Sequence, residues 1–152
     1  MKKAKKRNKG FSLIELLIVV AIILIIAAIA IPNLLKARRS ANEGSATASM
    51  RTVGSGELLY RSTQGVFTTL TGLSADGVID NVLGGGSKSG YLFTATPGGG
   101  TLAPLQFTAE AAPAVPTGAT ASGTRYYFTD ETQVIRYSLA GAASASSQPI
   151  GE

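Results

Sequence analysis

The strongest pattern in the chain is a continuous apolar run near its N-terminus. Eighteen of the nineteen residues from Leu13 to Ile31 are apolar, and the exception is Glu15. A helix of nineteen residues is about 28 Å long, which matches the hydrocarbon core of a bilayer. The pattern therefore predicts a membrane-spanning helix that begins near Phe11. A carboxylate inside such a helix costs about 2.5–3.5 kcal/mol at mid-membrane and less near the edge, so we expect Glu15 to have a function.

The helical pattern continues beyond the apolar run and becomes amphipathic. Pro32 is expected to kink the helix, because its ring removes one backbone hydrogen bond and crowds the preceding turn. Lys36, Arg38 and Arg39 follow, where the helix would leave the membrane, and they can snorkel to lipid headgroups or contact another subunit. Between residues 43 and 61, four apolar side chains fall near one helical stripe, which Glu57 interrupts: Ala46, Met50, Val53 and Tyr60. Gln64-Gly65 is the expected end of the helix.

The second half of the chain changes to strand patterns separated by turns. Residues 65–90 predict a loop with a short apolar element whose side chains cover one face of a sheet: Leu70, Leu73, Val78, Ile79, Val82 and Leu83. The expected strands are 91–96, 105–109, 125–129 and 133–138, with a loop over 113–123, a turn at Asp130-Glu131-Thr132 and a frayed tail over 139–152. The fold class is therefore α+β: a long N-terminal helix packed against a small antiparallel sheet.

Nine aromatic side chains are expected in the core and on the strand faces rather than in a binding platform or an electron-carrying chain: Tyr60, Phe67, Tyr91, Phe93, Phe107, Tyr126, Tyr127, Phe128 and Tyr137.

Charge and composition narrow the possible functions. The formal net charge of +5 comes from fourteen Lys and Arg against nine Asp and Glu, but six of the fourteen precede Gly10. The rest of the chain then holds eight basic residues against nine acidic ones, so nucleic-acid binding is not expected. The chain has no cysteine and no histidine, which excludes disulfides, His-based triads and His-based metal sites. No spacing indicates another catalytic site, and we expect no enzyme activity.

The basic N-terminal segment has the charge of an export signal with an unusual cleavage position. Six cations before Gly10 hold the N-terminus in the cytoplasm and direct the rest outward. A secretory signal is cut after its apolar core, whereas the small residue here precedes it. A cut after Gly10 would remove the charges and leave the membrane helix on the mature protein.

The segment Lys9-Gly10-Phe11-Ser12-Leu13-Ile14-Glu15-Leu16 resembles the prepilin leader of type IV pilins and type II secretion pseudopilins. The resemblance covers about residues 1–40. It implies cleavage after Gly10 by a prepilin peptidase and N-methylation of Phe11, and it makes Glu15 the fifth mature residue and Pro32 the twenty-second. The implied domains are a leader (1–10), a transmembrane and assembly helix (11–38) and a pilin head (39–152).

The resemblance implies a structural subunit that polymerises through its N-terminal helix. Glu15 would pair with the Phe11 amine of a neighbouring subunit, because an unpaired charge in a low dielectric is penalised heavily. The implied partners are other copies, the prepilin peptidase and methyltransferase, an assembly ATPase and a platform protein. The implied location is the bacterial inner membrane, with the N-terminus cytoplasmic, and then a periplasm-spanning or extracellular pilus.

Two other functions remain open from the sequence. A type II secretion major pseudopilin shares the N-terminal features, and such proteins bind calcium in their C-terminal loops. Asp130 and Glu131 are weak calcium candidates, with Asp76 and Asp80 as further carboxylates, and otherwise we expect no cofactor. A minor pilin for adhesion or DNA uptake would need an exposed basic or aromatic patch. The head offers only sparse charge for it: Arg51, Arg61, Lys88, Arg125 and Arg136.

Overall fold

The computed structural model describes residues 10–98 and 106–151. It divides the chain into two units, one ending at Leu34 and the other beginning at Leu35. The predicted leader lies outside the described residues except for Gly10. We call the unit that begins at Leu35 the head.

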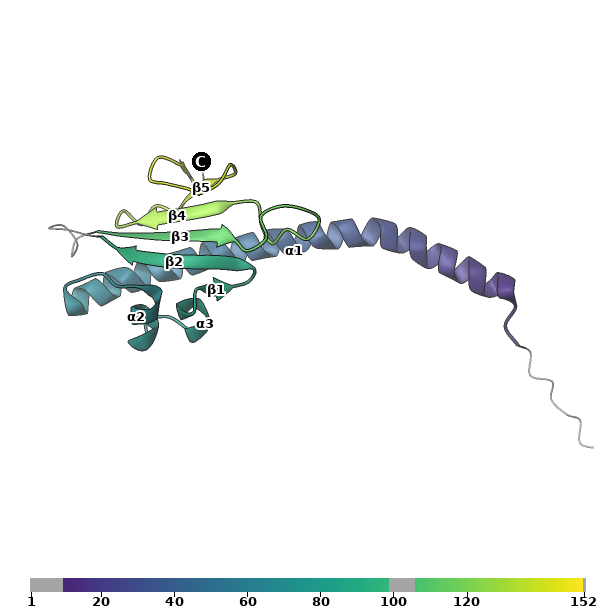
Figure 1. The fold of residues 1–152 in the computed structure, drawn as a ribbon, viewed down its shortest axis with the longest axis horizontal. Coiled ribbons are helices and arrows are strands. Elements are labelled where there is room, and N and C mark those ends of the chain that lie inside the picture. The colour runs from purple at the N-terminus through teal and green to yellow at the C-terminus, as the bar shows by residue number, and fades with distance from the viewer. Residues whose placement is uncertain (1–9, 99–105, 152) are drawn as a thin grey trace, which may run out of the picture. The chain divides into compact units, whose positions relative to one another are not determined.

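Helix α1 (Leu13–Gln64) is the longest element and carries the apolar run (Figure 1). It begins two residues after the expected Phe11. It ends where the sequence predicts: Gly65 has a φ of +78° and donates its N–H to the carbonyl of Arg61 at 2.8 Å. Glycine suits this position because it adopts left-handed backbone without steric cost. Pro32 lies inside the helix, which continues on both sides of it.

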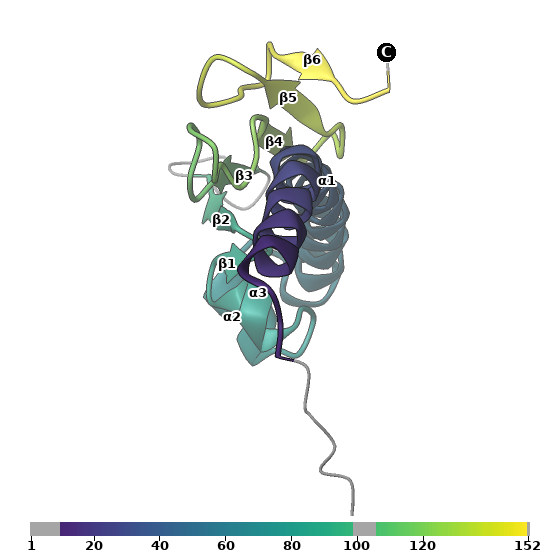
Figure 2. The same ribbon diagram turned by 90° about the vertical axis from the view of Figure 1, so that its right-hand side faces the viewer.

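The head contains one six-stranded sheet in which every neighbouring pair is antiparallel. The strands follow the order of the chain across the sheet, β1-β2-β3-β4-β5-β6 (Figure 2). Their bounds are β1 (Ser87–Lys88), β2 (Tyr91–Pro97), β3 (Phe107–Pro113), β4 (Tyr126–Asp130), β5 (Arg136–Ser138) and β6 (Gln148–Pro149). The longest pairing joins β2 and β3, from Tyr91 opposite Pro113 to Pro97 opposite Phe107.

The core lies between the head part of α1 and one face of the sheet. Ala46, Met50 and Val53 are buried, as the predicted stripe requires, and Tyr60 is half-buried beside them. Alternate strand residues meet them, since side chains on a strand point to opposite faces in turn. The sheet contributes seven buried residues to this cluster: Tyr91, Phe93, Ala95, Phe107, Ala109, Ala111 and Tyr127.

The segment between α1 and the sheet is more ordered than the predicted loop. It forms α2 (Leu70–Ala75) and α3 (Asn81–Gly84), whose first turns are capped by the side chains of Thr69 and Asp80. Four of the six apolar residues expected to cover the sheet are buried: Leu70, Leu73, Ile79 and Leu83. Val78 is half-buried, and Val82 is 59% exposed, so it does not join the core.

The second strand differs most from its prediction. The sequence predicts 105–109, whereas β3 spans Phe107–Pro113 and Leu105 lies outside the described residues. The prediction ended too early because Glu110, Ala111 and Ala112 have low strand propensity. Pairing with the whole of β2 places Ala109 and Ala111 in the core, where small side chains fit beneath α1.

The C-terminal residues also differ from their prediction, because they are not a frayed tail. β6 pairs with β5, and Ile150 donates its N–H to the carbonyl of Ile135 at 2.9 Å. Arg136 Nη1 donates to the carbonyl of Ser147 at 3.0 Å, which ties this segment to the sheet. Ala143 is buried. The predicted strand 133–138 is shorter than expected, since Gln133 has a φ of +62° and belongs to the turn before β5.

The predicted aromatic core is largely confirmed. Six of the nine aromatic side chains are buried: Phe67, Tyr91, Phe93, Phe107, Tyr127 and Phe128. Tyr60, Tyr126 and Tyr137 are half-buried. Phe128 lies on the opposite sheet face from Tyr127, where residues of the C-terminal segment approach it.

Candidate functional site

The peptide Gly10-Phe11 precedes the first turn of α1 and is exposed. The Phe11 side chain is 88% exposed, and an added Cβ at Gly10 would meet nothing within 4 Å. The fold therefore does not require glycine at position 10. If glycine is required there, the requirement comes from an enzyme that binds the peptide. An exposed, non-helical peptide is the form in which proteases reach a chain.

Ser12 and Glu15 cap the start of α1. The Ser12 N–H donates to Glu15 Oε2 at 2.8 Å, and the Ile14 N–H donates to Ser12 Oγ at 3.3 Å. This is the Ser-x-x-Glu capping pattern, in which the acid reaches back to the first residue of the turn. The sequence analysis missed it, although the spacing was visible. The cap holds the Glu15 carboxylate close to the Phe11 end of the helix.

None of the residues that the structure describes covers the apolar half of α1. Every large apolar side chain from Leu13 to Ile31 is exposed. The most apolar eighteen-residue window of α1 has a mean hydropathy of 3.3 and no buried residue. By length and composition, this is a helix that can cross a membrane. Such a surface is not stable in water and needs lipid or another protein against it.

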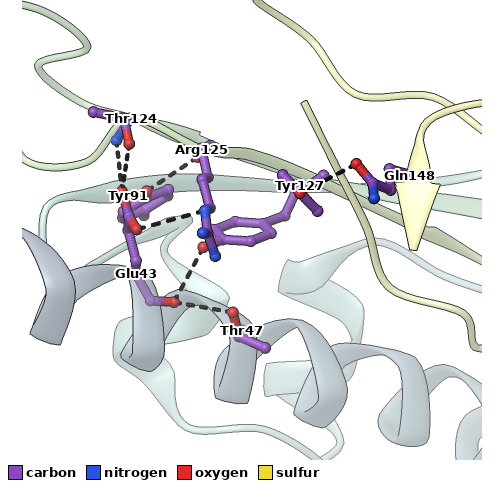
Figure 3. A network of polar contacts seen from close by, with 8 residues as sticks. Glu43, Thr47, Tyr91, Thr124, Arg125, Tyr127 and Gln148 are labelled. Atoms are coloured by element: carbon purple, nitrogen blue, oxygen red, sulfur yellow. Dashed lines mark hydrogen bonds and ion pairs between the residues drawn. The ribbon is translucent and has the colours of Figure 1, made fainter. Parts of the chain in front are cut away.

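A polar cluster in the head links α1 to the β3–β4 connection, and the sequence analysis missed it (Figure 3). Glu43 Oε1 accepts hydrogen bonds from the N–H and Oγ1 of Thr124, both at 2.8 Å. Glu43 Oε2 lies 3.9 Å from Arg125 Nε, and the Arg125 guanidinium lies 5.0 Å from the centre of the Tyr137 ring. Tyr91 donates its hydroxyl to the Arg125 carbonyl at 3.0 Å.

This cluster stabilises the head and offers no reactive group. Every charged or hydroxyl group in it has a partner on another element, and burial raises the pKa of Tyr91 and of Tyr127. The phenols therefore stay protonated near neutral pH and act as hydrogen-bond donors. The contacts of Glu43 with Thr124 and Arg125 join residues about 80 positions apart, so no local sequence pattern could predict them.

Comparison with known proteins supports the identity of the N-terminal segment. Residues 5–31 match the prokaryotic N-terminal methylation motif. Over 64 residues, the chain is 45% identical to the type IV wide pilus major component PilA4 of Thermus thermophilus, a match that covers 42% of this chain and 49% of the relative. The N-terminal part of the chain is therefore similar to type IV pilins.

A second relative shows a similarity of the same kind. The chain is 53% identical over 45 residues to the type IV major pilin protein PilA of Myxococcus xanthus, covering 30% of this chain and 20% of that protein. The chain thus matches about half or less of the length of these curated pilins. The α+β fold with a long helix and an antiparallel sheet is confirmed by the structure.

The calcium candidates do not come together. Asp130 Oδ1 accepts hydrogen bonds from the N–H and the hydroxyl of Thr132, so it acts as the predicted turn former. Asp80 instead caps α3 and pairs with Lys88 Nζ at 2.8 Å. Within residues 10–98 and 106–151, no group of three or more Asp, Glu, His or Cys side chains is placed to hold a metal.

Proposed function

We propose that this chain is a structural subunit of a type IV pilus-like filament. The observation that carries the proposal is the N-terminal methylation motif joined to an apolar helix that none of the described residues covers. A helix of this kind is stable in a bilayer and, after extraction, in the centre of a polymer of identical helices. The relatives named as pilus components share this part of the sequence.

The proposed maturation removes residues 1–10. A prepilin peptidase cuts after Gly10, and a methyltransferase adds one methyl group to the new Phe11 amine. The exposed peptide before α1 suits such a cut. Methylation keeps the amine charged, so the mature chain starts with a cation beside the capped end of the helix.

The proposed assembly uses Glu15 and the apolar face of α1. An incoming subunit lies in the inner membrane with its N-terminus cytoplasmic, and its Phe11 amine pairs with Glu15 of a neighbour. Two opposite charges in a low dielectric attract strongly, whereas each alone is costly. An assembly ATPase and a platform protein supply the work of extraction. The head provides the outer surface of a periplasm-spanning or extracellular filament.

The test is to image and purify filaments from cells with and without this chain. We expect surface fibres only when the chain is present, and an intact mass that begins at Phe11 with one added methyl group. Filaments that still contain residues 1–10 would contradict the proposed processing. Short periplasmic filaments whose subunit requires calcium would favour the type II secretion pseudopilin instead.

A further inference from the structure

A pocket of about 330 Å³ lies in the head beside the beginning of its helix. Three segments line it: α1, the β1–β2 turn, and the connection between β3 and β4. Leu35, Arg38 and Asn42 come from the helix. Sites for small ligands start at about this volume.

The walls of the pocket are held by hydrogen bonds between distant segments. Asn42 Nδ2 donates to the carbonyl of Ser122 at 2.9 Å, and the Val115 N–H donates to Ser122 Oγ at 3.0 Å. Ser45 Oγ donates to Ser89 Oγ at 2.9 Å. Gly90 has a φ of +74°, and a Cβ there would lie 2.8 Å from the Cβ of Ser122. The pocket is therefore built before any ligand arrives, which lowers the entropic cost of binding.

The pocket is cationic. Arg38 is the charged residue in its lining, and it is exposed. The adjacent Arg39 donates Nη2 to the carbonyl of Gly118 at 3.4 Å, while its buried Nε has no hydrogen-bond partner among the described residues. The nearest acid along the helix, Glu43, is already occupied by Thr124. Among the described residues, no carboxylate forms an ion pair with Arg38. A guanidinium in this state is suited to a phosphate, whose oxygens match its planar fork.

The position of Arg38 along α1 indicates where that phosphate comes from. Arg38 follows Ile31, the last residue of the apolar run, by seven residues, which is about 10 Å of helix. The headgroup layer of a bilayer extends about 5–8 Å beyond the hydrocarbon on each side. Helical side chains lean toward the N-terminus of their helix, so Arg38 reaches back toward the headgroups.

We propose that this pocket binds the phosphate of an anionic phospholipid headgroup while the subunit is in the membrane. Arg38 provides the charge and the fork, and Asn42 and the Ser89-Gly90 turn shape the walls. The inference rests on the membrane stage of the proposed function. It goes beyond general attraction of Lys36, Arg38 and Arg39 to a negative surface, because it assigns the selectivity to one side chain.

The experiment uses the full chain in lipid nanodiscs made of phosphatidylcholine with a minor share of phosphatidylglycerol. Native mass spectrometry counts the lipids that stay bound when the protein is released. We expect phosphatidylglycerol to be enriched on the wild type and the enrichment to fall at least tenfold in Arg38→Gln. Arg38→Lys keeps the charge but loses the fork, and we expect it to lose most of the enrichment as well.

Lys36→Gln is the matched control. It removes one positive charge two residues before Arg38, and the Lys36 side chain does not line the pocket. General surface attraction is worth about fivefold per cation, so this variant should lose about fivefold or less. Equal losses in Lys36→Gln and Arg38→Gln, or full enrichment in Arg38→Lys, would overturn the inference.

Two further outcomes separate the possible causes of failure. Displacement of the lipid by inorganic phosphate at similar concentration would identify a site for free phosphate and overturn the lipid assignment. A wild-type chain that enters nanodiscs without enriching phosphatidylglycerol overturns this inference alone. A chain that does not enter them at all contradicts the membrane stage of the proposed function, and the inference falls with it.

Discussion

The buried carboxyl of Glu57 should make the head less stable as the pH rises toward 7. Its side chain is 0% exposed within α1, on the stripe that otherwise holds apolar core residues. Oε2 accepts a hydrogen bond from the Thr68 N–H at 3.0 Å, while Oε1 has no partner among the described residues. Burial raises the pKa of Glu57 from 4.5 to about 7, and the Thr68 hydrogen bond opposes this rise only in part.

The direction of the effect follows from the protons bound in each state. Between pH 4.5 and 7 the folded chain keeps the Glu57 proton and the unfolded chain loses it, so the free energy of unfolding falls with rising pH. The difference between 4.5 and about 7, at about 1.4 kcal/mol per pH unit, corresponds to about 3 kcal/mol. This is a large share of the free energy of unfolding of a small domain, which is about 5–15 kcal/mol.

The assay is urea unfolding of the full chain in detergent micelles at pH values from 4 to 8, followed by circular dichroism. The wild type should lose stability across this range. Glu57→Gln should remove the slope, because an amide has no proton to lose, and its oxygen can still accept from Thr68. Glu110→Gln makes the same change on the exposed face of β3 and should keep the wild-type slope. An unchanged slope in Glu57→Gln would refute the reasoning.

Three further perturbations test the maturation, the assembly and the head. Gly10→Val should block cleavage, seen as a retained leader by mass spectrometry, without altering the fold, since nothing lies within 4 Å of its Cβ. Glu15→Ala should leave normal amounts of protein in the membrane but few or no filaments by electron microscopy. Glu15→Asp should cause a milder filament defect. A wild-type filament yield from Glu15→Ala, in cells with no second copy of the subunit, would exclude charge pairing. Glu43→Ala should lower the unfolding free energy by about 1–2 kcal/mol in urea titrations, because both Thr124 donors lose a charged acceptor but, being exposed, can bond to water instead. A change below about 0.5 kcal/mol would show that the cluster contributes little.

The sequence allowed helix α1, its end and its buried stripe to be predicted, because their signals are local. Apolar composition defined the exposed helix, and glycine at position 65 defined its end. The stripe of Ala46, Met50 and Val53 identified the face that meets the sheet. Even the acid that interrupts the stripe was visible, but only the structure shows that Glu57 is buried with it.

The head was harder to predict because its determinants are contacts between distant residues. The second half of strand β3, which is rich in alanine, exists because β2 and the core lie beside it, and no local preference indicates that half. The short strand β6 likewise depends on its pairing with β5. No local signal marks Glu43, because its role depends on Thr124 and Arg125, which lie some 80 residues later.

The capped position of Glu15 explains how one carboxylate can serve both its own helix and a neighbouring subunit. A carboxylate has about four acceptor positions, and the Ser12 N–H uses one of them. The cap also folds the side chain toward the end of the helix where the proposed cleavage would create the Phe11 cation. A neighbour's amine would then meet an acceptor that is already ordered, at a lower entropic cost. Glu15→Gln keeps an oxygen for the cap and loses only the charge. A filament defect in that variant would therefore be caused by the loss of the charge and not by the loss of the cap.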